Sequence, residues 1–220
     1  MMDRATVCAV IWDLDGTLVD NVEYHWQAFC EALASRNYVL SRERFESVIG
    51  QKMDTALRNL LGPDLALEEI QRLEMVKETR FRELMRAGGI TLLPGVRGWL
   101  DSLRDDGWRQ AIASSAPRLN LEVMLGAHSL EPYFGAVVCA EDVRNGKPAP
   151  EPFLMAAAKL GVAPDRCIVV EDAAPGLEGA QLAGMRTIGV GPSHDVLRAD
   201  VTVRHLNDLP VNAFSSLLSS

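Results

Sequence analysis

Two carboxylates lie close together near the N-terminus, directly after an apolar run. The run at positions 10–12 is followed by Asp13-Leu-Asp15-Gly16-Thr17. A carboxylate can act as a nucleophile, and a second acid two residues later can serve as general acid and then as general base. Asp-Gly also occurs in hairpin turns, but the segment that follows has the pattern of a helix. We therefore expect a buried strand that delivers acidic groups to the edge of a sheet.

Other predicted strands also end in polar side chains. One apolar run ends in Ser114-Ser115 and another in Glu171-Asp172, while Lys147 lies in a loop between them. In an open parallel sheet, ligands collect at the carboxyl ends of the strands. Acids, a hydroxyl and an ammonium group should therefore converge at one edge.

Such a group of carboxylates predicts a metal site. The acids would repel one another unless a cation neutralised them, and oxygen ligands favour Mg²⁺ over Zn²⁺. Lys147 and Ser114 can bind phosphoryl oxygens, and backbone N–H groups of the turn after Asp13 can bind more. The expected ligand is a phosphate beside Mg²⁺.

The spacing of apolar runs predicts an α/β fold with a doubly wound parallel sheet, a Rossmann-like core. Short runs alternate with helical patterns, and they are nearly continuously apolar, which is typical of parallel strands covered on both faces. The predicted strands are Thr6–Trp12, Arg109–Ala113, Gly135–Ala140, Cys167–Val170, Arg186–Val190 and Val201–Val203.

A long interval without strands interrupts this alternation and predicts an inserted α-helical cap domain. We expect residues 1–19 and 90–220 to form the core and residues 20–89 the cap, with a hinge where the chain passes between them. Ser41 and Asp64 are candidate N-caps. The predicted helices are Val22–Arg36, Ser41–Gly50, Met53–Leu61 and Leu67–Ala87.

Composition and charge disfavour several classes of protein. The chain has 220 residues, of which 48% are hydrophobic and 24% charged, enough for a core and a smaller lobe. Its net charge of −8 argues against a nucleic-acid partner. The run Ala5–Trp12 is too short for a membrane span or a signal peptide, so we expect a soluble cytoplasmic protein with no membrane partner. The four cysteines form no C-x-x-C pair and are expected to be buried, reduced thiols.

Four motifs, taken in order, resemble those of the haloacid dehalogenase superfamily. They are Asp-Leu-Asp-Gly-Thr-Leu-Val-Asp at 13–20, Ala-Ser-Ser-Ala at 113–116, Gly-Lys-Pro-Ala-Pro at 146–150 and Val-Glu-Asp-Ala-Ala-Pro-Gly at 170–176. The resemblance covers nearly the whole chain. It points to the branch with a helical cap after the first strand, which contains sugar-phosphate phosphatases and β-phosphoglucomutase, and it implies a monomer.

The resemblance implies roles for the residues of the first motif. Asp13 would be the nucleophile that becomes an aspartyl phosphate, and it would also bind Mg²⁺. Asp15 would protonate the leaving oxygen, activate water and reach the metal through its backbone carbonyl. Gly16 would let the chain turn sharply, and Thr17 would orient the loop or hydrogen-bond to the acid. The dehalogenases lack the second acid, so Asp15 disfavours their activity.

The other motifs complete the implied site. Ser114 and Lys147 would hold the transferring phosphoryl group, and Lys147 would offset the charge of Asp13. Asp172 would be a metal ligand, with Glu171 either a ligand or an acceptor for metal-bound water. From the residues alone, Glu171 and Asp172 could instead stabilise a helix N-terminus.

Four side chains of the expected cap are candidates for substrate binding: His25, Gln51, Lys52 and Lys77. His25 and Lys77 are similar to residues of sugar-phosphate members, but either could lie on a solvated helix face. Gln51 and Lys52 follow a glycine in a loop expected to face the substrate. The large aromatic residues of this segment are expected to belong to its core: Trp26, Phe29 and Phe45.

Three functions follow from this pattern, and a phosphatase of small phosphorylated metabolites, sugar or polyol phosphates, comes first. A β-phosphoglucomutase-type enzyme is the alternative. It is weakened because Met53 stands where that enzyme carries an arginine, although Lys52 could supply the charge. A noncatalytic receiver-like phospho-acceptor module would lack both Asp15 and the helical insertion. The sequence does not identify the substrate.

Overall fold

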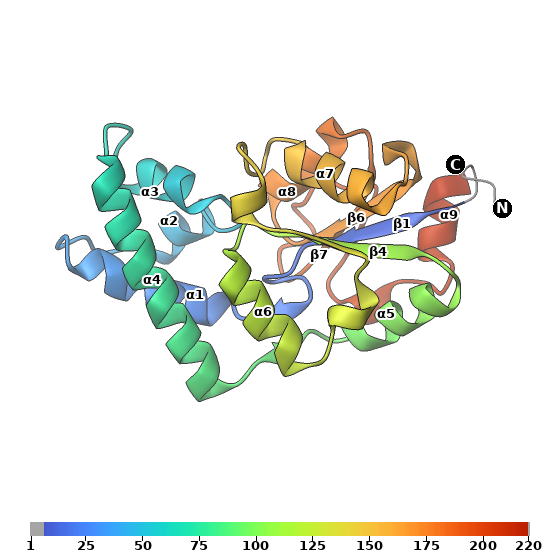
Figure 1. Cartoon of the computed structure of the whole chain (residues 1–220), viewed down its shortest axis with the longest axis horizontal. Coiled ribbons are helices and arrows are strands. Elements are labelled where there is room, and N and C mark those ends of the chain that lie inside the picture. Colours follow the sequence, from blue (N-terminus) through green and yellow to red (C-terminus); the bar gives the residue numbers. More distant parts are fainter. Residues whose placement is uncertain (1–6, 220) are drawn as a thin grey trace.

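A six-stranded parallel sheet forms the centre of the molecule, in a computed structural model that describes residues 7–219 (Figure 1). Its strand order is β5-β4-β1-β6-β7-β8, and every neighbouring pair is parallel. The strands are β1 (Ala9–Trp12), β4 (Arg109–Ala113), β5 (Ala136–Val138), β6 (Cys167–Glu171), β7 (Arg186–Val190) and β8 (Val201–Val203). The predicted doubly wound fold is confirmed.

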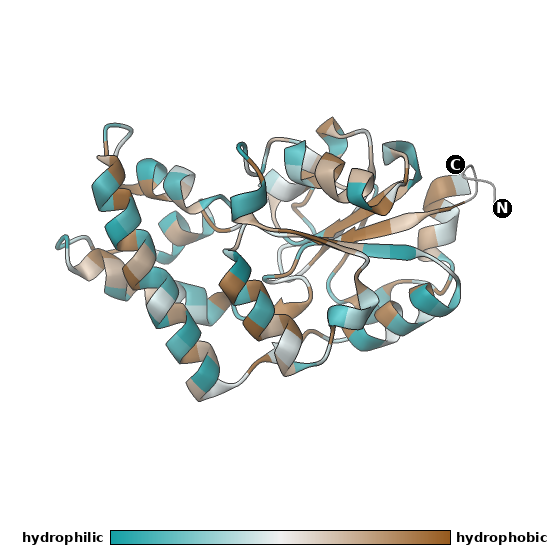
Figure 2. Ribbon diagram, in the orientation of Figure 1, coloured by the Kyte–Doolittle hydropathy of each residue, from teal (hydrophilic) through white to brown (hydrophobic). Residues whose placement is uncertain are grey.

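Helices cover both faces of the sheet, because side chains of successive strand residues point to opposite faces. In β1, Val10 and Trp12 belong to one hydrophobic cluster, and Ala9 and Ile11 belong to another. The strands are therefore largely apolar throughout, whereas the helices carry both polar and apolar residues (Figure 2). The helices of the core are α5 (Val96–Asp105), α6 (Arg118–Ala127), α7 (Glu151–Leu160), α8 (Ala174–Leu182) and α9 (Ala213–Ser219).

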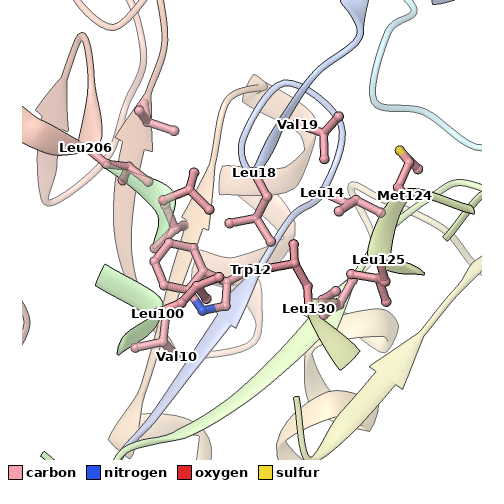
Figure 3. Close-up of a cluster of buried hydrophobic side chains, with 14 of the residues drawn as sticks. Val10, Trp12, Leu14, Leu18, Val19, Leu100, Met124, Leu125, Leu130 and Leu206 are labelled. Atoms are coloured by element: carbon pink, nitrogen blue, oxygen red, sulfur yellow. The ribbon is translucent and has the colours of Figure 1, made fainter. Parts of the chain in front are cut away.

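Trp12 lies at the centre of the larger cluster, fully buried among leucine side chains of the strands and helices (Figure 3). Its indole Nε1 donates a hydrogen bond to Gln110 Oε1 at 3.0 Å. Gln110 is also buried, and its Nε2 donates to the backbone oxygen of Leu100 in α5 at 2.9 Å. One amide thus satisfies two buried polar groups and ties β1 and β4 to α5.

Gln110→Met should destabilise the protein without altering its active site. The similar-sized apolar side chain leaves the buried Trp12 N–H without a partner, which costs about 1–3 kcal/mol, and removes a second donor from the Leu100 carbonyl. We expect urea unfolding to show a free energy of unfolding lower by about 1–3 kcal/mol. Gln71→Met, on an exposed position of α4, is the control. An unchanged urea midpoint for Gln110→Met would contradict the prediction.

Four helices lie between the first and second strands of the sheet and form the helical insertion (residues 22–88). They are α1 (Val22–Ala34), α2 (Arg42–Glu46), α3 (Met53–Leu61) and α4 (Leu67–Gly88). The insertion has a hydrophobic cluster of its own, which includes Phe29, Phe45, Leu57 and Leu73. The chain enters and leaves it through β2 (Val19–Asp20) and β3 (Thr91–Leu92), which pair antiparallel. The insertion lies at the end of the sheet opposite α9 (Figure 1).

Several predicted boundaries differ from those of the structure. The helix predicted at 41–50 ends at Glu46, while Ser41 caps it as expected by accepting a hydrogen bond from Arg44 N. Asp64 is not a cap, because α4 begins after Ala66. Thr6 of the first predicted strand lies outside the described residues. Short 3₁₀ helices occur at Glu131–Tyr133, Ala140–Asp142, Pro164–Arg166 and Leu206–Asp208.

The cysteines are less uniformly buried than the sequence predicts. Cys139 and Cys167 are buried, but Cys8 and Cys30 are partly exposed. No helix within residues 7–219 combines the length and the apolar character needed to cross a membrane.

Candidate active site

The carboxyl ends of β1 and β6 bring the acids together. The Asp13 backbone N–H donates to Val170 O at 2.9 Å, so Asp13 continues the pairing of the two strands and its side chain becomes buried. The chain then turns at Gly16, whose φ of +78° favours glycine. A Cβ atom there would lie 2.1 Å from an Asp172 carboxylate oxygen. Glycine therefore permits both the turn and the approach of Asp172.

Lys147 lies between two of the acids. Its Nζ donates to Asp13 Oδ1 at 2.5 Å and to Glu171 Oε1 at 2.6 Å, and all three side chains are buried. Burial disfavours the ammonium, but the two carboxylates outweigh it and raise the pKa of Lys147. Lys147 is thus a fixed positive charge beside Asp13.

Asp13, Glu171 and Asp172 form an acidic cluster in which carboxylate oxygens lie within 4.8 Å of one another. Burial and the neighbouring acids raise the pKa values of Asp13 and Asp172 well above the usual range. Both oxygens of Glu171 are already hydrogen-bonded, to Lys147 and to Ala173 N. The three carboxylates form an oxygen donor set that suits a hard divalent cation such as Mg²⁺, and the ammonium of Lys147 offsets part of their charge.

Asp15 has a separate set of partners. Its Oδ1 accepts hydrogen bonds from Asn21 Nδ2 at 2.5 Å and from His25 Nε2 at 3.2 Å, and Ser114 Oγ lies 3.5 Å from its Oδ2. Burial favours the neutral acid, but His25, Asn21 and the charge of Lys77 together lower the pKa of Asp15. The two acids of the first motif therefore have different environments.

A chain of hydrogen bonds runs from Asp15 into the helical insertion. His25, in α1, stacks on Phe81 with ring centroids 3.9 Å apart, and Lys77 Nζ lies 2.9 Å from its Nδ1. Burial and the nearby ammonium lower the pKa of His25, so the neutral imidazole is favoured. Lys77 also donates to Glu78 Oε1 at 2.7 Å.

A small cavity of about 60 Å³ lies between the two acids and the helical insertion. Two contacts hold the insertion against the core beside it: Ser115 Oγ donates to Gly50 O at 2.8 Å, and Lys52 Nζ donates to Val143 O at 3.4 Å. The residues that line the cavity are Asp13, Asp15, His25, Phe29, Val48, Ile49, Gly50, Gln51, Met53, Lys77, Glu78, Ser115, Ala116 and Pro117.

The structure brings together most of the predicted site residues, but the loop after Gly50 differs from expectation. Lys52 does not line the cavity, because its ammonium reaches the core carbonyl of Val143. Gln51 lines the cavity, but its amide is hydrogen-bonded to Ser47 and Asn59.

Four further residues lie in or beside the site: Thr17, Asn21, Phe29 and Glu78. Thr17 does not hydrogen-bond to the acid, because its buried hydroxyl forms no hydrogen bond within the described residues, and its role in orienting the loop stays a prediction. Phe29 belongs to the core of the insertion, as predicted, and also lines the cavity. Sequence reasoning missed Asn21 and Glu78; the polar residue at the start of α1 was the available indication for Asn21.

Comparisons with known proteins identify the family of the chain. The family model described as haloacid dehalogenase-like hydrolase matches residues 10–190. The chain is 32% identical to Protein CbbY of Rhodobacter capsulatus, over 82% of this chain and 83% of that protein. It is 31% identical to β-phosphoglucomutase of Bacillus subtilis, over 91% of each. It is 33% identical to hexitol phosphatase A of Escherichia coli, over 91% of this chain and 92% of that protein.

Solved structures share the fold over nearly the whole chain. β-Phosphoglucomutase from Clostridium difficile superposes with a TM-score of 0.87 at 26% identity, covering 97% of this chain and 98% of that one. CbbY from Rhodobacter sphaeroides in complex with phosphate superposes with a TM-score of 0.84 at 27% identity, covering 96% and 100%.

Proposed function

The chain belongs to the haloacid dehalogenase-like hydrolases, and from this premise we propose that it is a Mg²⁺-dependent phosphatase. Its substrates are small phosphorylated metabolites, sugar or polyol phosphates, and the reaction passes through an aspartyl phosphate. One observation carries the proposal: Asp13 is bonded to Lys147 within the acidic cluster, while Asp15 is held separately by Asn21 and His25. Two neighbouring acids in unlike environments suit unlike roles.

In the first half of the reaction, a carboxylate oxygen of Asp13 attacks phosphorus and the bond to the leaving oxygen breaks. Asp15 gives a proton to that oxygen, so the alcohol leaves neutral. An incoming phosphate dianion would raise the pKa of Asp15 by like-charge repulsion, which favours the protonated acid. Lys147 and Ser114 hold the phosphoryl oxygens.

In the second half, water attacks the phosphorus atom of the aspartyl phosphate. Asp15, now ionised, takes a proton from the water, and the bond between phosphorus and Asp13 breaks. The hydrogen bonds from Asn21 and His25 to Asp15 Oδ1 fix the position of this base. The products are inorganic phosphate and the free carboxylate of Asp13.

Asp13 and Asp172, with Glu171 beside them, are the residues that would hold Mg²⁺. The ion would neutralise the carboxylates and polarise a phosphoryl oxygen. Because Glu171 already accepts hydrogen bonds from Lys147 and Ala173, we assign direct binding to Asp13 and Asp172 and a supporting position to Glu171.

Mg²⁺ should stabilise the protein through Asp172. Binding to the native state alone adds about 2.7 kcal/mol at a concentration about 100 times the Kd, so the thermal midpoint should rise with Mg²⁺ and turnover should stop in EDTA. In Asp172→Asn the Mg²⁺-dependent rise should largely disappear, whereas the exposed Asp195→Asn should keep it. An equal rise in Asp172→Asn would refute the assignment of this ligand.

We further propose that residues 20–89, which contain the helical insertion, act as a cap on the core formed by 1–19 and 90–220. His25 and Lys77 would contact the leaving group, since both line the cavity beside Asp15. The contacts of Ser115 with Gly50 and of Lys52 with Val143 would exclude water until the leaving alcohol is in position.

A phosphomutase is the second candidate, favoured by the likeness to β-phosphoglucomutase over 91% of the chain. That activity requires a site for the second phosphate of a sugar bisphosphate. The loop of the insertion and the core opposite it supply mainly apolar side chains to the cavity: Val48, Ile49, Met53, Ala116 and Pro117. Lys77 is the one cationic side chain among the described lining residues, and Glu78 balances it. This lining favours hydrolysis of monophosphates.

Phosphorus NMR of the protein with Mg²⁺ and a panel of sugar and polyol phosphates tests the proposal. The panel includes β-glucose 1-phosphate primed with the corresponding bisphosphate. We expect the signal of inorganic phosphate to grow, at rates that rank the substrates. Conversion of the 1-phosphate into the 6-phosphate without free phosphate would establish the mutase instead.

A further inference from the structure

We propose that Glu78 is a positioning residue, which acts with Asn120 of the core to align Lys77 when the helical insertion rests on the core. The inference rests on the proposed function, in which Lys77 and His25 contact the leaving group. Glu78 itself would act on the reaction only through Lys77.

The three side chains are almost completely buried. The exposed fraction is 3% for Lys77, 6% for Glu78 and 0% for Asn120. Glu78 Oε1 accepts from Lys77 Nζ at 2.7 Å, and Glu78 Oε2 accepts from Asn120 Nδ2 at 2.5 Å. Each carboxylate oxygen therefore has its own donor, one within the insertion and one in the core.

The orientation of the Asn120 amide is fixed from both sides. Arg82, one helical turn after Glu78 in α4, donates to Asn120 Oδ1 at 3.1 Å. The amide oxygen thus faces a cation and the amide nitrogen faces a carboxylate, which is the favourable pairing at both ends. The helices α4 and α6 that carry these residues lie side by side (Figure 1), so this contact joins the insertion to the core.

Lys77 consequently lies between two contacts that cross from the insertion to the core. On one side, Lys77 bonds to His25, which bonds to Asp15 of the core. On the other, Lys77 bonds to Glu78, which bonds to Asn120 of the core. Both crossing bonds require the insertion to rest on the core, so Lys77 is held from both sides only in that arrangement.

Charge balance makes Glu78 necessary for this alignment. A buried ammonium is costly unless it is paired and hydrogen-bonded. His25 offers Lys77 only a ring nitrogen, 2.9 Å from Nζ, whereas Glu78 offers a carboxylate oxygen at 2.7 Å, so Glu78 is the anion paired with this ammonium. Although burial favours the neutral acid, Lys77, His25 and Asn120 hold the pKa of Glu78 below its ordinary value. The ionised carboxylate keeps the ammonium inside the cavity and directed at the leaving group.

A set of three variants tests the proposal: Glu78→Gln, Asn120→Asp and the two combined. Glu78→Gln removes the charge that pairs with Lys77, and Asn120→Asp sets two carboxylates against each other. We expect each single variant to lower kcat about 10- to 100-fold with a smaller change in KM, as is typical when the supporting partner of a functional residue is lost. The combined variant restores a donor–acceptor pair across the contact but leaves Lys77 without the adjacent carboxylate. We therefore expect its kcat to stay below that of the wild type, yet well above the product of the two single losses.

Glu83→Gln is the matched control, because Glu83 is an exposed acid of the same helix that pairs with Arg80. Its kcat should equal that of the wild type. If Glu78→Gln kept the wild-type kcat, or if the combined variant showed the product of the two single losses, the proposal would be wrong.

Hydrogen exchange of α4 and α6, followed by mass spectrometry, separates this proposal from the proposed function. Exchange should be faster in each single variant and return to the wild-type rate in the combined variant, whether or not any phosphate ester is hydrolysed. If the combined variant regained the wild-type exchange rate but no protein, the wild type included, hydrolysed a phosphate ester, the phosphatase would be refuted and the contact retained. Unchanged exchange in the single variants would refute the contact.

Discussion

Asp13→Asn is expected to abolish turnover while leaving the fold intact. The amide can still accept the hydrogen bond from Lys147, but it is a poor nucleophile and cannot form the aspartyl phosphate. We expect kcat to fall by about 10⁴-fold or more, as for the loss of other catalytic nucleophiles. Release of inorganic phosphate from the best substrate of the panel measures the effect.

The stability of Asp13→Asn separates a chemical effect from misfolding. Burial disfavours the charged form of Asp13, and the negative charges of Glu171 and Asp15 add to this effect and raise its pKa. A neutral amide relieves that repulsion, so the thermal midpoint in the absence of Mg²⁺ should be no lower than that of the wild type. Asp195→Asn, at an exposed position of the core, should keep full activity. Turnover by Asp13→Asn at the wild-type level would exclude Asp13 as the nucleophile.

Lys147→Met should reduce both stability and activity. Lys147 is the cation to which Asp13 and Glu171 are bonded, and its removal leaves buried carboxylates facing one another. Breaking such a buried pair typically costs about 3–5 kcal/mol in the free energy of unfolding. Activity should fall by about 10²-fold or more, because a charge that stabilises the transferring phosphoryl group is also lost. Urea unfolding and phosphate release measure the two effects.

Mg²⁺ gives a second test of the same charge balance. A divalent cation bound to the acidic cluster would offset part of the lost positive charge, so Lys147→Met should gain more stability from Mg²⁺ than the wild type gains. Lys159→Met, at an exposed lysine of α7, should change neither stability nor activity appreciably. An Mg²⁺-independent urea midpoint in Lys147→Met, equal to that of the wild type, would contradict the assigned role of Lys147.

The strands of the sheet were predictable because their apolar runs are nearly continuous. The predicted bounds of Arg109–Ala113 and Arg186–Val190 agree with those of β4 and β7. In the helical insertion, the segment predicted as one helix at 41–50 is helical only to Glu46. Turns follow, with bonds such as Val48 N–H to Phe45 O, and the segment closes at Gly50, whose φ is +82°. The spacing of apolar residues in that segment does not predict where the helix ends and the turns begin.

The juxtaposition of Asp13 and Asp172 was predictable for a similar reason. Parallel strands place their carboxyl ends at one edge, so residue types at strand ends are sufficient to bring these groups together. The direction of a side chain in a loop depends on tertiary contacts that a sequence pattern does not contain. Lys52 therefore points to the Val143 carbonyl and leaves the cavity without the second cation that it could have supplied.

The contact between Glu78 and Asn120 was even less predictable from the sequence. In a helix, two acids such as Glu74 and Glu78 lie on the same face, and their spacing does not tell which of them is buried. Glu78 is buried because α6 brings Asn120 against it, and α6 is 42 residues further along the chain at that contact. The pairing of these two residues follows from the docking of two helices that are distant in sequence.

The antiparallel pairing of β2 and β3 allows the insertion to vary independently of the sheet. Val19 lies opposite Leu92 and Asp20 opposite Thr91, so the insertion departs and returns through adjacent strands. A segment anchored in this way can be lengthened, shortened or exchanged without shifting the register of the six-stranded sheet. Changes of length or sequence between these two strands can therefore alter the side chains that α1 and α4 contribute to the cavity, while the acidic cluster at the ends of β1 and β6 stays in place.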